Sequence, residues 1–352
     1  MSAEAKPRMR AKVRREPTAA LPEVDRVDID ERLPGAGWRV IAAKEFGDHL
    51  LSVRFIVLLI VLGLAAAIPL YFAAAQIRAV APDASGSSAI FLFLFALGAE
   101  EIQNQSAFTF VGIVAPLLGL AFAFDAVNGE RSEGTLPRLL AQPIYRDDVI
   151  NGKFAAGMAS IGIVIISVVV FIAAFGLLRL GIVPHPQEVF RLVAWVIATF
   201  LYVAVWLAFG LLLSVLVHRA ATAALIGFGI WLLLTIFGGL ITQFIGGLLA
   251  PGVDASVDSV LGSLQLQQLI TRLLPSTLYS EISVVLLNPS VTQVSAPATI
   301  GQFQQAQQQI PSLLSLDQSI LLVWPHVVAL VALTVACFAG AYVAFMRQEV
   351  RA

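Results

Sequence analysis

The chain has 352 residues, of which 58% are hydrophobic and 13% are charged, and its formal net charge is −1. Soluble domains contain about 45–50% apolar and about 25% charged residues, so this composition excludes an ordinary soluble protein and indicates an integral membrane protein. The single cysteine excludes a disulfide framework and a thiolate metal site.

Residues 1–37 are polar, carry several prolines and show no helical apolar period. This composition predicts a disordered cytoplasmic tail, and the lack of an apolar core segment predicts no cleavable secretory signal. The first half of the tail is basic and the second half is acidic. The basic cluster is open to two interpretations: it attracts anionic lipid headgroups, or it is a solvated tail that helps to fix the topology.

A different pattern runs through residues 38–53. Apolar residues, including Trp38 and Phe46, recur at helical spacing, and charged residues such as Lys44 and Glu45 face the other way. Lys44 and Asp48 are four residues apart and can form an ion pair. Because this segment directly precedes a long apolar run, we expect an amphipathic helix in the membrane interface.

Six segments have the roughly 20 apolar residues that are needed to cross about 30 Å of hydrocarbon. They are residues 55–75, 108–127, 154–178, 192–217, 220–246 and 320–346. The sequence therefore predicts an all-α integral membrane protein with a tail (1–37), an amphipathic interfacial helix (38–53) and a six-span transmembrane domain (54–352).

The distribution of positive charge predicts the orientation. All but four of the 22 Lys and Arg residues lie on one side of the predicted spans. The four exceptions are Arg78, Arg179, Arg191 and Arg272. Because positive charge is retained on the cytoplasmic side, we expect both termini and the loop 128–153 in the cytoplasm, and the protein in the cytoplasmic membrane of a prokaryote.

Two segments are predicted on the external side. Residues 91–95 form an apolar run too short to span, which predicts a short helix or a re-entrant piece. The region 247–319 contains an amphipathic pattern from Val257 to Leu274, stopped by Pro275, and a glutamine-rich stretch at 302–309. We expect a helical extracellular cap that lies on the membrane or on the spans.

The predicted spans hold few ionisable residues. Ion-coupled transporters and channels usually place such residues along their pathway, so a secondary transporter is disfavoured. Small residues recur at four-residue spacing at Gly152, Ala156 and Ser160. This spacing allows close helix packing, either within the chain or between subunits.

The loop 128–153 carries dense charge between two apolar runs. Glu130 and Glu133 extend the helix of the second span, and Gly134 can end that helix in the left-handed conformation. Thr135 can then cap a short helix that ends at Pro143. This helix presents Leu136, Leu139 and Leu140. A leucine-bearing helix clamped between two spans has the form of a docking surface, and an ordinary cytosolic turn is the alternative.

The two ends of this charged stretch lie at the depth of the membrane interface. Asp125 closes the second span, and Lys153 lies where the third begins, with Asp147 as the expected N-cap. We interpret Asp125 and Lys153 as structural rather than catalytic residues.

Residues 124–154 read FDAVNGERSEGTLPRLLAQPIYRDDVINGKF. This run resembles the signature of the permease subunits of type-2 ABC exporters. The matching residues are Phe124, Asp125, Val127, Glu130, Gly134, Thr135, Leu136, Leu139, Leu140, Pro143, Ile144, Arg146, Val149, Gly152, Lys153 and Phe154. AKEF at 43–46, PSTLYSEISVVLLNP at 275–289 and FMRQEVR at 345–351 are also similar to that family. Pro137 departs from the pattern and leaves the start of the short helix open.

The resemblance implies a six-span subunit that dimerises with a second permease copy, contacts membrane lipids and binds cytoplasmic ATPase subunits, with no nucleic acid among its partners. In such permeases the loop between the second and third spans and the amphipathic helix contact the ATPase. By resemblance, the ATPase-docking residues are Glu130, Glu133, Gly134, Thr135, Leu136, Leu139, Leu140, Pro143 and Arg146. Lys44, Glu45 and Phe46 would act from the interfacial helix.

The chain itself is not expected to hydrolyse ATP. Gly152 and Lys153 are followed by Phe154, and Asp147 stands where a phosphate-binding loop needs glycine. The resemblance therefore implies an exporter subunit without catalytic, cofactor or metal sites, with ATP and Mg²⁺ on the partner chain. Two alternatives stay open: a non-transporting anchor or sensor in an ABC-like complex, and a secondary transporter.

Overall fold

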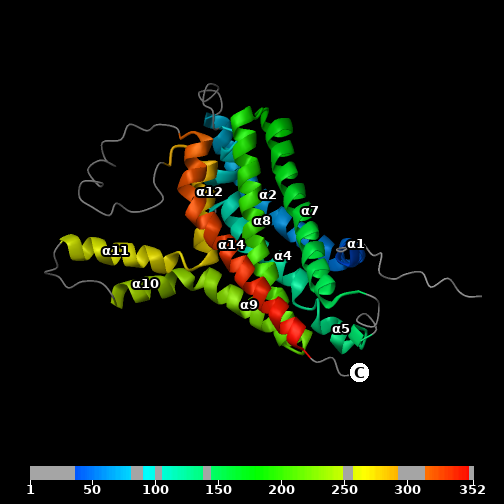
Figure 1. The fold of residues 1–352 in the computed structure, drawn as a ribbon. Coiled ribbons are helices and arrows are strands. Elements are labelled where there is room, and N and C mark those ends of the chain that lie inside the picture. The colour runs from blue at the N-terminus through cyan, green and yellow to red at the C-terminus, as the bar shows by residue number, and fades with distance from the viewer. Residues whose placement is uncertain are drawn as a thin grey trace, which may run out of the picture. The chain divides into compact units, whose positions relative to one another are not determined.

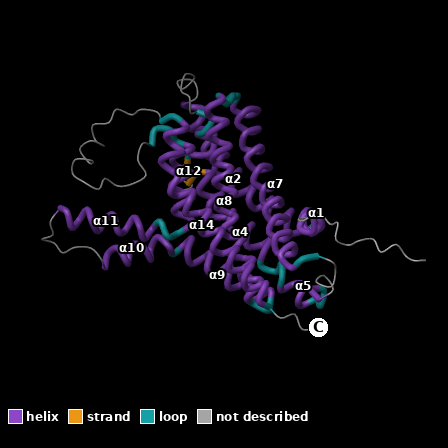
Figure 2. The backbone as a smooth tube through the Cα atoms, in the orientation of Figure 1, coloured by secondary structure: helices purple, strands orange, loops and turns teal. Residues whose placement is uncertain are grey.

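The computed structural model describes residues 36–80, 90–99, 105–137, 144–248, 257–291 and 314–348. The described chain is helical (Figures 1 and 2), apart from a two-residue antiparallel ladder between β1 (Gly98–Ala99) and β2 (Gln105–Ser106). The helices are α1 (Ala36–Leu50), α2 (Val53–Val80), α3 (Phe93–Ala96), α4 (Ala107–Ala123), α5 (Asn128–Ser132), α7 (Arg146–Leu180), α8 (Pro186–Leu216), α9 (Ala220–Ile236), α10 (Gly238–Leu248), α11 (Val257–Thr271), α12 (Pro275–Leu287) and α14 (Leu316–Arg347).

Within the described residues, five helical segments are long and apolar enough to cross a membrane. They are Val53–Phe72, Ala107–Ser132, Arg146–Leu180, Pro186–Leu216 and Leu316–Arg347. Two bent helix pairs, α9 with α10 and α11 with α12, raise the number of candidate spans to as many as seven. The prediction of a multi-pass helical membrane protein is therefore confirmed, and the predicted six spans fall inside this range.

Helix α8 is the centre of the bundle. It packs against α4, α7, α9, α12 and α14 (Figure 1), and most of its side chains are buried, although Phe190, Val193 and Ile197 are exposed on one face. Its first turn is fixed by Glu188, whose carboxylate accepts hydrogen bonds from the backbone N–H groups of His185 and Phe91, both at 2.7 Å. The hydrogen bond from Phe91 joins the start of α8 to the segment that contains α3.

The apolar run at 91–95 forms a short helix, as predicted. Phe91, Leu92 and Phe95 are buried, and α3 packs against α2, α4, α7 and α12. The run is therefore part of the core of the bundle.

Arg191, predicted to flank the outer ends of the spans, is buried. Its guanidinium donates to the carbonyl oxygens of Leu286 and Leu314 and to Ser319 Oγ. These acceptors lie at the end of α12 and at the start of α14, so one side chain ties both helices to α8. These three acceptors replace the water that the buried guanidinium has lost, which keeps its burial from being costly.

The fifth predicted span, 220–246, is wrong as a single helix. Helix α9 ends at Ile236, α10 begins at Gly238, and the two axes differ by 57°. A Cβ on Gly238 would lie 2.8 Å from Leu274 Cδ1, so the chain turns where glycine allows this close contact. The apolar run continues through the break, which is why composition did not reveal it.

The region 247–319 contains helices, as expected. Helix α11 covers most of the predicted segment from Val257 to Leu274, and Pro275 is the first residue of α12, which turns by 102° from the preceding helix. Proline suits this position because the first helical turn needs no N–H donor from it. The stretch 302–309 lies outside the described residues, as does the tail up to residue 35.

Helix α7 begins at Arg146, eight residues before the predicted third span. Its N-cap is Tyr145, so the prediction of Asp147 as N-cap is wrong. Asp147 and Asp148 instead occupy the first turn, where negative charge complements the helix dipole. The last part of the predicted loop 128–153 is therefore helical, and Lys153 lies inside α7.

Helices α4 and α8 approach most closely at Gly119. A Cβ at this position would lie 2.7 Å from Leu207 N and 2.8 Å from Val203 O, which are backbone atoms of α8. We predict that Gly119→Ala forces the two helices apart and destabilises the protein by about 1–3 kcal/mol. The midpoint of thermal unfolding in detergent measures this loss.

Gly63 in α2 provides the matched control, because nothing lies within 4 Å of its Cβ position. Gly63→Ala should leave the midpoint unchanged or raise it, since alanine favours a helix by about 1 kcal/mol over glycine. Equal effects of the two substitutions would contradict the close α4–α8 contact.

Candidate functional site

A buried ion cluster joins three segments of the chain that are far apart in sequence. The side chain of Lys153 on α7 is 3% exposed, and its Nζ lies 3.0 Å from Glu45 Oε1 on α1 and 2.7 Å from Glu130 Oε1 on α5. We call these three residues the junction cluster. A buried lysine without such partners would carry a large desolvation cost, so the three elements are held in one arrangement.

The approach of α1 to α7 depends on the small residues of α7. A Cβ on Gly152 would lie 2.8 Å from the carbonyl oxygen of Trp38, and Ala156 is 1% exposed. Ser160 Oγ lies 3.1 Å from His49 Nδ1. The small-residue face of α7 therefore contacts α1. This confirms the interpretation that the spacing serves helix packing within the chain.

The rim of the junction cluster is charged. Lys44 Nζ lies 3.5 Å from Glu45 Oε1 and 3.3 Å from Asp48 Oδ2, so the predicted pair of Lys44 and Asp48 is confirmed. Partial burial acts to lower the pKa of Lys44, but the two carboxylates outweigh it and raise that pKa. In the described part of the chain, Glu130 Oε2 is buried without a hydrogen-bond partner.

The start of α5 is anchored to the end of α8. The backbone N–H of Val127 donates to Ser214 Oγ at 2.9 Å, and the side-chain amide of Asn128 donates to the carbonyl oxygen of Val217 at 3.2 Å. Asn128 is fully buried. The segment that follows the second candidate span is therefore bound to the central helix.

Gln348 ties the end of α14 to the same region. Arg131 donates to Gln348 Oε1, and Arg146 donates to the carbonyl oxygen of Gln348 at 3.1 Å. The Gln348 amide in turn donates to the carbonyl oxygen of Val215 at 2.7 Å. One glutamine thus connects α5, α7, α8 and α14.

Asp125 and Arg54 form a further ion pair beside the junction cluster. The Arg54 guanidinium also lies 5.3 Å from the centre of the Phe124 ring. Since Arg54 is in the first turn of α2 and Asp125 follows α4, this contact joins the ends of two helices. Asp125 is thus in an ion pair at the end of the second candidate span, where the sequence placed it.

The predicted docking segment is described only in part. Gly134 has φ 68° after the end of α5, so its predicted role as a helix terminator is confirmed. The hydroxyl of Thr135 donates back to the carbonyl oxygen of Glu130 at 3.2 Å, and Leu136 and Pro137 that follow are helical. Leu139, Leu140 and Pro143 lie outside the described residues.

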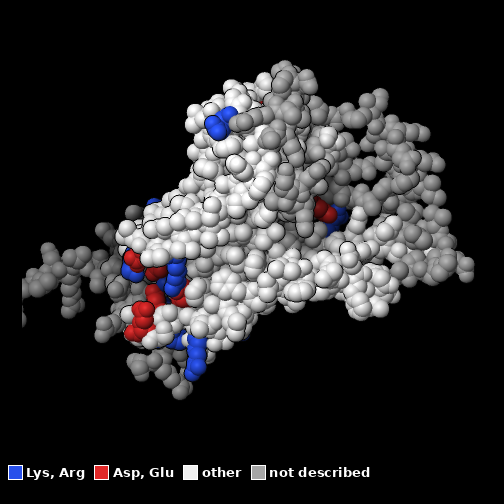
Figure 3. Space-filling model, turned by 180° about the vertical axis from the view of Figure 1, so that it is seen from behind, with Lys and Arg blue, Asp and Glu red and all other residues white. Residues whose placement is uncertain are grey.

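Leu136 does not belong to an exposed leucine surface, because it is only 2% exposed. The prediction that Leu136 is exposed together with the other leucines of the docking helix is therefore wrong. Glu133 and Thr135 are exposed, whereas Phe46 and Arg146 are half-buried. Figure 3 shows that basic and acidic side chains gather at one end of the described surface, next to a wide uncharged zone.

Sequence reasoning missed the contacts that join these elements. Ser214 and Gln348 carried no signal of their own, because each is a single neutral residue at the end of an apolar run. The small residues of α7 did indicate a closely packed face, but they did not identify α1 as its partner.

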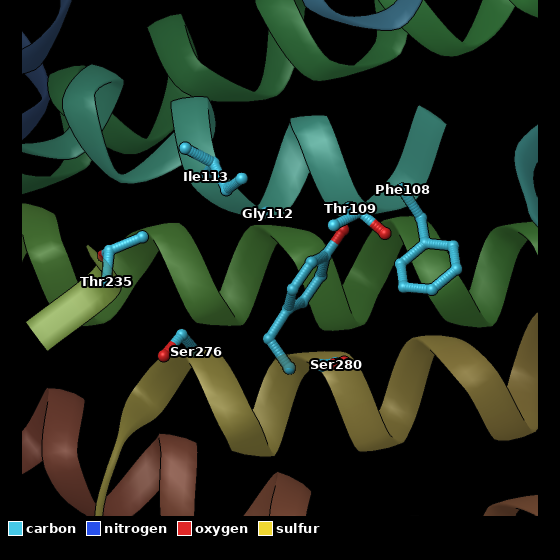
Figure 4. Close-up of a pocket in the computed structure, with 8 residues that line it drawn as sticks. Phe108, Thr109, Gly112, Ile113, Thr235, Ser276 and Ser280 are labelled. Carbon is cyan, nitrogen blue, oxygen red and sulfur yellow. The ribbon is translucent and has the colours of Figure 1, made fainter. Parts of the chain in front are cut away.

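A separate cavity lies between α4, α9 and α12. Its volume is about 230 Å³, and hydroxyl groups and apolar side chains share its wall (Figure 4). The lining residues are Phe108, Thr109, Gly112, Ile113, Thr235, Ser276, Tyr279 and Ser280. Within the described residues, Thr235 Oγ1 is buried without a hydrogen-bond partner.

These features define a multi-pass helical membrane protein with a charged junction at one end of the bundle. The pattern that describes the ABC-2 family transporter proteins matches residues 39–350. The chain therefore belongs to the ABC-2 transporter family and is a permease, the membrane subunit that carries no ATPase domain.

A curated relative supports this assignment. The chain is 30% identical over 132 residues to the probable ABC transporter permease protein NosY of Stutzerimonas stutzeri. The match covers 36% of this chain and 46% of the relative. ABC permeases pair with ATPase subunits, and a membrane subunit of this family is expected to hold no cofactor. Within the described residues, no three His, Cys, Asp or Glu side chains form a group that could hold a metal ion.

The junction cluster makes a prediction about stability. Lys153→Met would leave two partly buried carboxylates facing each other without a cation, which should cost about 3 kcal/mol. Unfolding in detergent, followed by heat or denaturant, measures this cost. Lys44→Met is the matched control and should cost about 0–1 kcal/mol, because Lys44 is 66% exposed.

Adding Glu45→Gln and Glu130→Gln to Lys153→Met removes the repelling charges and should restore part of the stability. If the triple variant were as unstable as Lys153→Met, packing rather than charge would explain the loss.

A second prediction concerns pH. Burial lowers the pKa of His49, although the carboxylate of Glu45 acts in the opposite direction. The unfolded chain, in which histidine has a pKa of about 6.5, therefore binds a proton more readily than the folded protein. Stability contributed by neutral His49 is present above about pH 6.5 and is lost as the pH falls below that value. The unfolding midpoint of His49→Gln should thus fall less between pH 7.5 and pH 5.5 than that of the wild type; equal slopes would refute this assignment.

Proposed function

We propose that this chain is the membrane-spanning permease of an ATP-driven export system, coupled to a separate cytoplasmic ATPase through the segment 130–146. The family assignment supports the transporter class, and the resemblance of residues 124–154 to exporter permeases supports the direction. Substrate would leave the cytoplasm along a pathway that changes its accessibility when the ATPase subunits close.

The junction cluster is the observation that carries this proposal. Lys153 connects α1, α5 and α7 through two short ion pairs. Any force on the segment after α5 would reach the third candidate span through a contact that costs several kcal/mol to break. Docking at the neighbouring residues 130–146 would therefore move helices rather than only deform a loop.

The charge distribution supports a six-span topology with both termini in the cytoplasm. In this topology α2, α4, α7, α8, α9 and α14 cross the membrane, and the junction cluster lies at the cytoplasmic end. Positive charge on that side is the expected retention signal for short loops. A second permease copy, identical or related, would complete the transporter.

A non-transporting anchor or sensor would share the spans and the docking segment. Reconstitution with the partner ATPase separates the two functions: a transporter moves cargo in proportion to ATP hydrolysis, whereas an anchor changes hydrolysis without flux. A secondary transporter would need no ATPase and would respond to an ion gradient.

We predict that the double variant Leu139→Ala/Leu140→Ala loses co-purification with the ATPase by at least about tenfold, which corresponds to about 1.4 kcal/mol of binding free energy. Leu178→Ala is the control, because Leu178 is 83% exposed at the other end of α7 and should not affect this interaction. Undiminished binding by the folded double variant would place the docking surface elsewhere.

A further inference from the structure

The cavity between α4, α9 and α12 combines apolar surface with hydroxyl groups (Figure 4). All eight residues that line it are uncharged. The carboxylate of Glu281, which follows the lining segment of α12, is engaged by Arg272 and His326 instead. A charged ligand would lose its hydration in this cavity without gaining a counter-ion from the lining residues. The lining therefore favours a neutral ligand.

Side chains from two other helices hold the part of α4 that lines the cavity. Pro116 has no N–H group, so the carbonyl oxygen of Gly112 lacks its usual donor within the helix, and the Tyr202 hydroxyl donates to it at 3.0 Å. The next carbonyl oxygen, that of Ile113, accepts a hydrogen bond from Trp231 Nε1 at 3.1 Å. Helix α4 is thus bound to α8 and α9, and this wall cannot close the cavity without breaking these bonds.

The ring of Tyr279 forms part of the wall on α12. It stacks on the ring of Tyr202, with centres 4.5 Å apart and planes inclined by 10°, and its hydroxyl accepts a hydrogen bond from Thr199 at 3.3 Å. A Cβ on Gly112 would lie 2.8 Å from Tyr279 Cε1, so the ring reaches the backbone of α4. The walls are therefore already formed without a ligand, as is usual for small-molecule sites.

Thr235 on α9 supplies a hydrogen-bonding group that lacks a partner. Its Oγ1 is buried and makes no hydrogen bond within the part of the chain that the structure describes. The hydroxyl of Thr109, in contrast, pairs with Ser106 Oγ at 3.0 Å. Because a buried polar group without a partner is costly, a group of this kind beside a cavity points to a ligand that supplies the partner.

The volume of the cavity limits the size of that ligand. An engineered cavity of about 150 Å³ in another protein is known to hold benzene. The cavity described here has about 230 Å³, so it has room for a molecule, or part of one, with roughly ten non-hydrogen atoms. A medium-chain alcohol such as octan-1-ol is of this size.

We propose that this cavity is a binding site for a neutral amphiphile. An alcohol or ester group of the ligand forms a hydrogen bond with Thr235 Oγ1, and a short apolar chain lies against Phe108 and Ile113. Two sources offer this chemistry: a free alcohol, and the uncharged glycerol region of a membrane lipid. The site lies within one chain and needs no ATPase, so the proposal stands or falls independently of docking and export.

The test labels the full chain, purified in detergent, with octan-1-ol that carries a photoreactive diazirine, and identifies the labelled residues by mass spectrometry. We expect saturable labelling of the lining residues that excess octan-1-ol displaces. Octanoate and octylammonium have similar chains but carry a charge, so displacement should need at least about tenfold higher concentrations. Val335 on α14 is 59% exposed and is the internal control for partitioning into the micelle, because its labelling should not saturate.

Two variants test the wall itself. Thr235→Val keeps the shape of the side chain but removes the hydroxyl, and should raise the half-saturating concentration about threefold or more. Ser276→Leu fills part of the cavity and should raise it at least about tenfold. Thr334→Val on α14 is the matched control, because this hydroxyl donates to the carbonyl oxygen of Leu330 at 2.9 Å and does not line the cavity. An unchanged unfolding midpoint verifies that each variant is folded.

Displacement by added dioctanoylglycerol distinguishes the two sources. Displacement at lower concentration than octan-1-ol would assign the site to a lipid, and displacement by octan-1-ol alone would assign it to a free alcohol; both results support a neutral amphiphile. Labelling as unsaturable as that of Val335 would overturn the proposal and leave water as the occupant. Equal displacement by octanoate, or wild-type affinity in both folded wall variants, would overturn it as well.

Discussion

The position of Lys153 constrains much of the structure at one end of the bundle. An ammonium group that is 3% exposed is stable only if its charge is balanced, and both balancing carboxylates come from other segments. Helices α1 and α5 must therefore reach α7 together. Around them, Ser214 and Gln348 bind the ends of α8 and α14 to the same place. Without the ion cluster, the hydrogen bonds of Ser214, Asn128 and Gln348 would still join the ends of α5, α8 and α14, but α1 would lose its ion pair with α7.

The sequence predicted the helices well, because their signals are local. Apolar length identified the candidate spans, small-residue spacing identified the face of α7 that receives α1, and Gly134 marked the end of α5. The junction cluster was not predicted as a cluster, since Glu45 and Lys153 are 108 residues apart and two predicted spans lie between them. Local patterns do not contain pairings between distant segments. Lys153 was accordingly assigned a structural role, but without its partners.

The error at the fifth span has a similar cause. Residues 220–246 are apolar throughout, and the break at Phe237 depends on how closely Gly238 approaches Leu274, a residue of the turn between α11 and α12. Hydropathy measures whether a residue tolerates lipid, and both halves of this segment do. The direction in which the second half runs is set by packing. The same reasoning explains Leu136, whose apolar character predicted an exposed docking contact but equally suits the buried position that it occupies.

Helix α14 connects the two charged regions of the described chain. At one end Gln348 binds Arg131 and Arg146, and about 32 Å away along the helix His326 binds Glu281 of α12. A helix transmits axial displacement with little loss, because its backbone hydrogen bonds run along the axis. The ion pair of His326 with Glu281 holds α14 to α12, and the contacts of Gln348 hold its other end at the junction. Displacement of the junction would then tilt α14 about its contact with α12, and this converts a local push into a change of angle between α14 and α8.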